Sequence, residues 1–124
     1  MKILYIIRGV PGSGKSTLAH KLTDNVVEAD QFMYVNGEYK WAATKLHYAH
    51  SMCKRTVEDY MIEGRDVIAV ANTFIKRKDV QPYIDLAEEY GYKVIQKVCT
   101  GNYQNVHNVP QETVDKMRKK FEEI

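Results

Sequence analysis

Short apolar runs alternate with amphipathic stretches along the whole of this chain. Apolar residues that follow one another without a polar break are typical of strands covered on both faces, and β-branched side chains favour that conformation. Such runs, or a regular alternation of apolar and polar residues, predict four strands at residues 3–7, 26–29, 67–71 and 92–98. Apolar residues spaced three and four apart predict four helices at residues 15–24, 46–60, 84–90 and 111–121.

The order of these elements predicts the fold class. Strands that alternate with helices form parallel sheets, because the return connection between two parallel strands is long enough to hold a helix. We therefore expect an α/β fold, a three-layer sandwich with a central parallel sheet of about four strands and helices on both faces. A chain of 124 residues fits one compact domain, so residues 1–124 are expected to form a single domain.

Composition narrows the class of protein without indicating a ligand. Hydrophobic residues make up 44% and charged residues 27% of the chain, which is typical of a globular protein rather than a disordered one. No apolar run approaches the roughly 18 residues of a membrane span, and the first residues do not form a signal peptide. Cys53 and Cys99 lack metal-ligand spacing, so we expect reduced thiols and a cytoplasmic protein. A net charge of +2 is too small to indicate a partner by itself.

Residues 9–16 carry a complete phosphate-binding motif, Gly-Val-Pro-Gly-Ser-Gly-Lys-Ser, between a predicted buried strand and a predicted helix. Glycines in such a loop let successive backbone N–H groups turn toward phosphate oxygens, and the start of the following helix adds partial positive charge. Lys15 is placed to reach the β and γ phosphates, and the Ser16 hydroxyl to ligate Mg²⁺. We therefore expect a P-loop NTPase fold that binds a nucleoside triphosphate through Gly9, Pro11, Gly12, Ser13, Gly14, Lys15, Ser16 and Thr17.

The size of the chain favours one class of reaction. A domain of this length has no room for the additional domains of a motor or a switch GTPase, and the sequence contains no Asn-Lys-x-Asp guanine motif. A small phosphotransferase is therefore the leading prediction.

Asp30 follows the second predicted strand and is the first candidate for the acid–base chemistry. The carboxyl ends of neighbouring parallel strands meet at the edge of the sheet where ligands bind, so Asp30 is expected to face the γ phosphate. There it can accept a proton from an attacking hydroxyl or hold Mg²⁺ through water. The alternative is structural: Asp30 would then cap the segment that begins at Gln31.

The phosphate loop and Asp30 belong to a larger set of residues in which the sequence resembles a known family, the kinase domain of phage polynucleotide 5′-kinase and its small P-loop relatives. The resemblance extends over nearly the whole chain and begins with the form Gly-x-Pro-Gly-Ser-Gly-Lys-Ser-Thr of the phosphate loop. That loop is common to many kinases, whereas the ordered set of further matches is more specific. These matches are Ala29-Asp30 with Phe32, Asn36-Gly37 with Tyr39, Ala49-His50 with Arg55, Asn72-Thr73, Pro82-Tyr83, Gly91-Tyr92 with Val94, and His107 with Val109-Pro110.

The resemblance implies transfer of the γ phosphate of ATP to a hydroxyl, typically the 5′-OH of a nucleic acid. Carried over by position, it also implies a role for individual residues. These roles are the general base for Asp30, the triphosphate and Mg²⁺ contacts for Lys15, Ser16 and Thr17, the substrate side for His50, Asn72 and Thr73, and the adenine border for Val109 and Pro110.

The chain departs from the family pattern at three points. Ala71 stands where the family usually has Asp before Asn-Thr, and Met33 stands where the nucleic-acid kinase has an arginine three residues beyond its catalytic Asp. The segment between the fourth strand and Pro110 is a shortened lid, and residues 99–110 contain no Lys or Arg. A lid arginine normally stabilises the charge of the transferred group, so a catalyst without one needs another cation.

Three consecutive cations, Lys76, Arg77 and Lys78, follow the third strand at the phosphate-loop edge of the predicted sheet. Such a run is often only a solvated turn. At this edge, however, Arg77 can act on the transferred group and Lys76 can bind the acceptor. Arg118 on the last predicted helix is another source of charge, although four acidic residues neutralise that helix.

Three functional hypotheses follow. The leading one is a cytoplasmic ATP-dependent kinase that acts on a hydroxyl of a nucleic acid or nucleotide, and the cations together with an aromatic cluster after Asp30 favour it. That cluster is formed by Phe32, Tyr34, Tyr39 and Trp41, for which simple packing is the alternative. A kinase for a small metabolite such as a nucleoside is the second hypothesis. A nucleotide-binding module with little turnover is the third, favoured by Ala71 and the uncharged lid.

Overall fold

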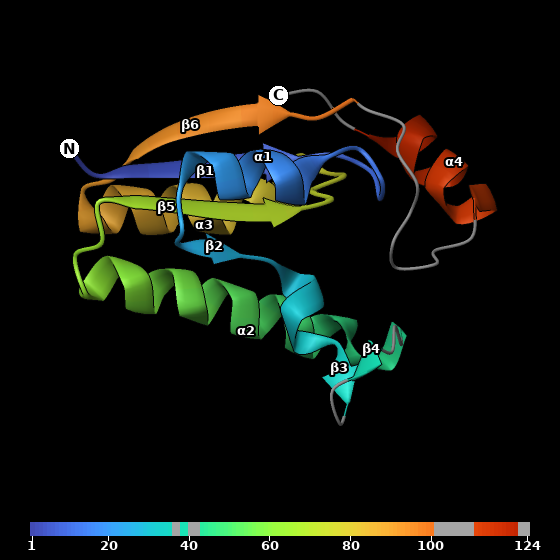
Figure 1. The fold of residues 1–124 in the computed structure, drawn as a ribbon, viewed down its shortest axis with the longest axis horizontal. Coiled ribbons are helices and arrows are strands. Elements are labelled where there is room, and N and C mark those ends of the chain that lie inside the picture. Colours follow the sequence, from blue (N-terminus) through green and yellow to red (C-terminus); the bar gives the residue numbers. More distant parts are fainter. Residues whose placement is uncertain (36–37, 40–42, 101–110, 122–124) are drawn as a thin grey trace.

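Four parallel strands form the central sheet of this computed structural model, in the order β2-β5-β1-β6 (Figure 1). The structure describes residues 1–35, 38–39, 43–100 and 111–121. The inner strands β1 and β5 are apolar along almost their whole length, because both of their faces are covered. The bounds are Ile3–Arg8 for β1, Val26–Val27 for β2, Val67–Asn72 for β5 and Lys93–Val98 for β6.

Helices cover both faces of the sheet. α1 (Lys15–Leu22) lies on one face, and α2 (Ala43–Ile62) and α3 (Arg77–Tyr90) lie on the other (Figure 1). Alternate residues of each strand therefore enter two separate cores. The core under α1 consists of Ile7, Ala19, Val26, Ala69 and Ala71. The larger core includes Leu4, Ile6, Val27, Cys53, Val57, Ile68, Val70, Val80 and Leu86. The predicted α/β sandwich with a four-stranded parallel sheet is confirmed.

Short elements follow β2, and one further helix lies beyond β6. They are the 3₁₀ helix η1 (Ala29–Phe32), the antiparallel pair β3 (Tyr34–Val35) and β4 (Glu38–Tyr39), and α4 (Gln111–Lys120). The strand predicted over residues 26–29 is shorter in the structure, because the chain turns into η1 at Ala29. Within the described residues, no helix has both the length and the apolar character needed to cross a membrane. The predicted lid, residues 101–110, lies outside the described part of the chain.

α3 begins at Arg77, whereas the sequence predicted a helix only from residue 84. The backbone N–H of Lys76 donates to the Asp79 carboxylate at 3.2 Å, and the N–H of Asp79 donates to the Lys76 carbonyl at 3.0 Å. These reciprocal bonds close the first turn, although its three leading residues are charged and exposed. Pro82 lies inside the helix, before residue 84, at which the apolar spacing begins.

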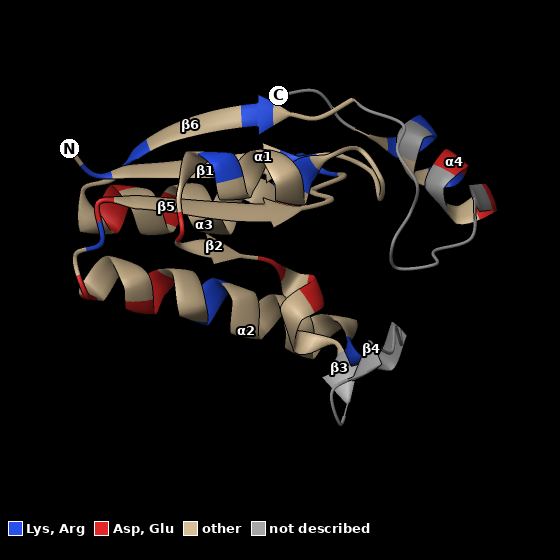
Figure 2. Cartoon of the chain, viewed as in Figure 1, with Lys and Arg blue, Asp and Glu red and all other residues tan. Residues whose placement is uncertain are grey.

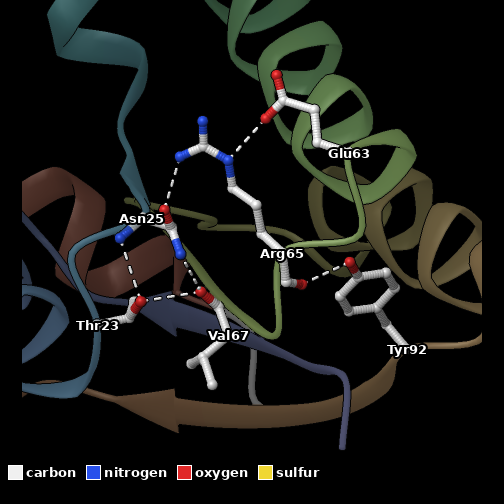
Figure 3. Close-up of polar contacts among 6 residues, drawn as sticks. All are labelled: Thr23, Asn25, Glu63, Arg65, Val67 and Tyr92. Atoms are coloured by element: carbon white, nitrogen blue, oxygen red, sulfur yellow. Dashed lines mark hydrogen bonds and ion pairs between the residues drawn. The ribbon is translucent and has the colours of Figure 1, made fainter.

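Polar contacts join the connections at the amino ends of the strands (Figure 3). Thr23 Oγ1 and Asn25 Nδ2 both donate to the carbonyl oxygen of Val67, at 2.8 and 2.9 Å. Arg65 Nη1 donates to Asn25 Oδ1 at 2.7 Å, and the Tyr92 hydroxyl donates to the Arg65 carbonyl at 2.6 Å. The network holds together the amino ends of the strands, opposite to the carboxyl ends at which the phosphate loop lies.

Candidate active site

The phosphate loop connects the carboxyl end of β1 to the first turn of α1. Gly12 has φ 81° and Gly14 has φ 95°, in the left-handed region that favours glycine. Gly9 is required for a different reason: a methyl group there would overlap the Ser13 side chain and lie 2.8 Å from the carbonyl oxygen of Cys99. These glycines therefore permit the tight curl that the motif predicts.

The first turn of α1 starts without a side-chain cap. Its N-cap is Gly14, which has no side chain to accept hydrogen bonds from the first amides of the helix. The Ser13 hydroxyl is also buried in the loop, and within the described residues its oxygen has no hydrogen-bond partner. Uncapped amides and an unpaired hydroxyl are groups that a phosphate can satisfy, so the loop fits an anionic phosphate ligand.

Lys15 extends over the phosphate loop. Its Nζ donates to the carbonyl oxygen of Val10 at 3.1 Å. Burial lowers the pKa of Lys15, while the negative charges of Asp30 and Glu28 raise it. The ammonium group is therefore held between the loop and two carboxylates, where a triphosphate would meet it.

Two acidic residues stand at the junction of β2 and η1 (Figure 2), of which only Asp30 was expected from the sequence. Asp30 lies in η1, two residues beyond Glu28. Glu28 was missed, yet the Ser16 hydroxyl donates to its Oε2 at 3.3 Å. Burial first, and then the charge of Asp30, raise the pKa of Glu28. The available signal was its position directly after the apolar pair of β2 and two residues before Asp30.

These oxygen donors suit a magnesium ion. Mg²⁺ prefers oxygen ligands and is usually held by one or two carboxylates together with the phosphates of the substrate. The described residues contain no group of three or more His, Cys, Asp or Glu side chains that could hold a metal ion on their own. Ser16, Glu28 and Asp30 carry the oxygen atoms that would hold Mg²⁺ together with the phosphates of a bound nucleotide.

Asn72, at the end of β5, is buried and its amide group is used inside the protein. Its Oδ1 accepts a hydrogen bond from the backbone N–H of Ala29 at 2.8 Å, and its Nδ2 donates to the sulfur of Cys53 at 3.5 Å. Asn72 therefore fixes the start of η1, and with it the position of Asp30. The resemblance implied a place for Asn72 beside the substrate, and these bonds give it a positioning role that the sequence did not reveal.

The other predicted acceptor-side residues lie on three different elements. Thr73 follows β5, and its carbonyl oxygen accepts the N–H of Gly9 at 3.3 Å, which joins this connection to the phosphate loop. His50 is a partly exposed residue of α2; the partial loss of water around its ring lowers its pKa, while the charges of Asp79 and Asp30 raise it. Lys76 is the N-cap of α3, and Arg77 is the first residue of that helix. Val109 and Pro110 lie outside the described residues.

Comparison with known proteins assigns the family. A family model described as AAA domain matches residues 4–102 of the chain. The chain belongs to this AAA domain family. The match runs from β1 past the end of β6 and includes the whole phosphate loop, so the P-loop kinase-like fold and the resemblance predicted from the sequence are confirmed.

The chain is similar to parts of larger proteins and to most of one small protein. It is 25% identical to human NEDD4-binding protein 2 over 97% of its own length, which is 8% of that protein. It is 31% identical to the uncharacterized protein PM0531 of Pasteurella multocida, over 94% of this chain and 75% of that one. The chain thus spans most of the second relative and a small fraction of the first.

Solved structures share the fold at lower identity. The structure of the Pnkp1/Rnl/Hen1 RNA repair complex matches 97% of this chain and 44% of its own chain, with a TM-score of 0.67 and 19% identity. The Mycobacterium tuberculosis APS kinase CysC Cys556Ala mutant matches 98% of both chains, with a TM-score of 0.58 and 12% identity. At these identities the likeness shows the fold alone.

Proposed function

We propose that this protein is an ATP-dependent kinase that transfers the γ phosphate to a hydroxyl, with the 5′-OH of a nucleic acid or nucleotide as the acceptor. The observation that carries the proposal is that Lys15, Ser16, Glu28 and Asp30 lie together at the phosphate loop. This set contains a cation for the triphosphate, oxygen donors for a metal ion and a carboxylate for the acceptor proton.

The reaction follows from the roles of these side chains. The loop amides and Lys15 bind the phosphate oxygens and hold the γ phosphorus in place. The acceptor oxygen bonds to that phosphorus as the bond to the bridging oxygen of ADP breaks, and the proton of the hydroxyl passes to Asp30. Mg²⁺, when bound with the nucleotide, neutralises charge on the β and γ phosphates.

Two features support a nucleic acid or nucleotide as the acceptor. Lys76, Arg77 and Lys78 start α3 directly beyond β5, and Lys76 and Arg77 are exposed there. Cations at this edge suit an acceptor that carries phosphate groups. In addition, the fold is shared with a component of an RNA repair complex. The lid sequence contains no Lys or Arg, so we propose that Arg77 supplies the positive charge that stabilises the transferred phosphoryl group.

Incubation with γ-labelled ATP and Mg²⁺ tests the proposal directly. The acceptors are 5′-OH DNA, 5′-OH RNA, nucleosides, and 5′-phosphorylated DNA as the blocked control. We expect label to appear on 5′-OH ends and not on blocked ends. Asp30→Asn should lower turnover by about 10² or more, because the amide cannot accept the proton. Transfer to nucleosides alone would support a metabolite kinase, and ATP binding without transfer to any acceptor would support a binding module.

A further inference from the structure

Glu28 directly follows β2, and its backbone is still extended. The parallel register of β2 and β5 pairs Val26 with Ala69 and Val27 with Val70, and the N–H of Ala29 donates to the Asn72 side chain, so the chain runs beside the end of β5 at Glu28. The core under α1 contains Val26, Ala69 and Ala71. Because side chains alternate along extended backbone, position 28 is on the same face of the sheet as Val26. Near its end, at Ala71, β5 contributes only a methyl group, and the carboxylate comes from Glu28, the residue that follows β2.

The contact of Glu28 with Ser16 is informative about the hydroxyl. Ser16 Oγ donates a hydrogen bond to Glu28 Oε2 at 3.3 Å. The lone pairs of the Ser16 oxygen therefore point away from the carboxylate and are available to a cation. Ser16 lies in the first turn of α1, directly after Lys15, and is therefore at the phosphate loop. Glu28 orients the hydroxyl that the motif assigns to the metal.

The charge at this edge calls for a metal ion rather than for phosphate alone. Next to the phosphate loop, Glu28 and Asp30 bring two negative charges that act on the single positive charge of Lys15, while the other cations of this edge begin α3. A triphosphate adds further negative charge at the same place. Without a divalent cation, Glu28 would repel the nucleotide, and with one it would hold the cation in place.

We propose that Glu28 is a carboxylate of the magnesium site, holding Mg²⁺ together with Ser16 and Asp30 and making nucleotide binding depend on that metal. The proposal rests on the proposed function for the identity of the nucleotide. It predicts opposite effects of the Glu28 charge with and without Mg²⁺, which a merely structural residue would not show.

Binding of ADP and ATP, measured by calorimetry in excess Mg²⁺ and again in EDTA, tests the proposal without requiring catalysis. For the parent protein we expect Mg²⁺ to raise affinity at least about tenfold. In Glu28→Gln the amide oxygen can still accept the Ser16 hydrogen bond, while the charge is gone. We expect the Mg²⁺ enhancement to fall below about threefold, and affinity in EDTA to equal or exceed that of the parent.

Two further variants sharpen the experiment. Glu88→Gln removes an exposed carboxylate from α3 and should keep the parent enhancement. Glu28→Asp keeps the charge on a side chain one methylene shorter and should retain part of the enhancement, which also provides a second variant if Glu28→Gln is poorly folded by thermal melting.

The outcomes separate this inference from the proposed function. An undiminished Mg²⁺ enhancement in Glu28→Gln, or an enhancement lost equally in Glu28→Asp, would overturn the role of Glu28 while leaving the kinase proposal intact. A parent protein that binds Mg²⁺–ATP but transfers no phosphate would overturn the kinase proposal. In that case the Mg²⁺ enhancement of nucleotide affinity in Glu28→Gln would still test the role of Glu28.

Discussion

The guanidinium group of Arg8 holds the carbonyl oxygen of Phe74 with two hydrogen bonds, from Nε at 3.1 Å and from Nη2 at 2.8 Å. Arg8 is the last residue of β1, directly before the phosphate loop, and it is 1% exposed. Phe74 is buried in the connection from β5 to α3 and has φ 46°, a left-handed conformation that is strained for a residue with a side chain. The pair therefore joins the nucleotide side of the site to the segment that leads to Lys76 and Arg77.

Replacing Arg8 is expected to destabilise this connection. Arg8→Met keeps an unbranched side chain but removes both bonds to Phe74 and the cation–π contact with the Phe121 ring, 4.4 Å from the guanidinium carbon to the ring centroid. Hydrogen bonds from a charged donor contribute roughly 1.5–3 kcal/mol, so a loss of about that size in the free energy of unfolding is expected by urea denaturation. Arg55→Met, at an exposed position on α2, is the control and should change stability by less than about 0.5 kcal/mol. Equal stability of the two variants would contradict the structural importance of the pair.

Lys15 is expected to be needed for nucleotide affinity. Lys15→Ala removes the ammonium group that offsets phosphate charge, and one charge-assisted contact is worth about 10- to 100-fold in binding. Calorimetry with Mg²⁺–ATP should show a loss of that order, with the melting temperature of the ligand-free protein nearly unchanged. Lys21→Ala, at an exposed position near the end of α1, is the matched control. Unchanged affinity in Lys15→Ala would refute the assignment of the phosphate loop.

The cations at the start of α3 are expected to act on catalysis. Phosphoryl transfer spreads negative charge over three oxygens, and positioned cations stabilise that charge. Replacing Lys76, Arg77 and Lys78 together by Ala should therefore lower turnover more than about tenfold while ATP affinity changes little. The Asp79 carboxylate still accepts the backbone N–H of residue 76, so the helix start is preserved. Full activity of the triple variant would mean that the charge comes from another part of the chain or from a partner.

The two cysteines are expected to differ in reactivity. Cys53 is fully buried, whereas Cys99 is half-buried beside Gly9, and its backbone N–H donates to the Arg8 carbonyl at 2.7 Å. Burial raises the pKa of the Cys99 thiol, and the charge of Lys15 lowers it in part. Because the thiolate is the reactive form, alkylation of Cys99 by iodoacetamide should be slow at neutral pH and accelerate as the pH rises through that pKa.

Mg²⁺–ATP should slow this alkylation, since it covers the loop beside Cys99. Peptide mass spectrometry after timed alkylation measures both sites in one sample, and unreacted Cys53 is the internal control. Faster labelling of Cys53 than of Cys99 would contradict the burial found here.

Sequence periodicity was sufficient for the phosphate loop and for the four strands of the central sheet, apart from the end of β2, because these depend on local patterns; it did not predict the short strands β3 and β4. Residues 3–7 and 67–71 are uninterrupted apolar runs, and the loop motif is contiguous. The start of α3 was predicted too late, since a charged first turn closed by Lys76 and Asp79 has no apolar periodicity. The roles of Glu28 and Asn72 could not be derived from spacing, because each depends on a partner brought close by the fold: Ser16 for the first and Ala29 for the second.

The central place of β1 in the sheet affects which strands unfold locally and exchange their amide protons with solvent. β1 is hydrogen-bonded on both sides along all six residues, to β5 and to β6, whereas β6 is bonded on one side and most of its side chains are exposed. Local opening events start where few buried contacts must break, so the amide protons of β1 exchange with solvent only when the whole domain unfolds, and those of β6 exchange through fraying. The phosphate loop is thus attached to a strand that is expected to exchange slowly, so the loop should keep its anchor while the strand at the edge of the sheet opens locally.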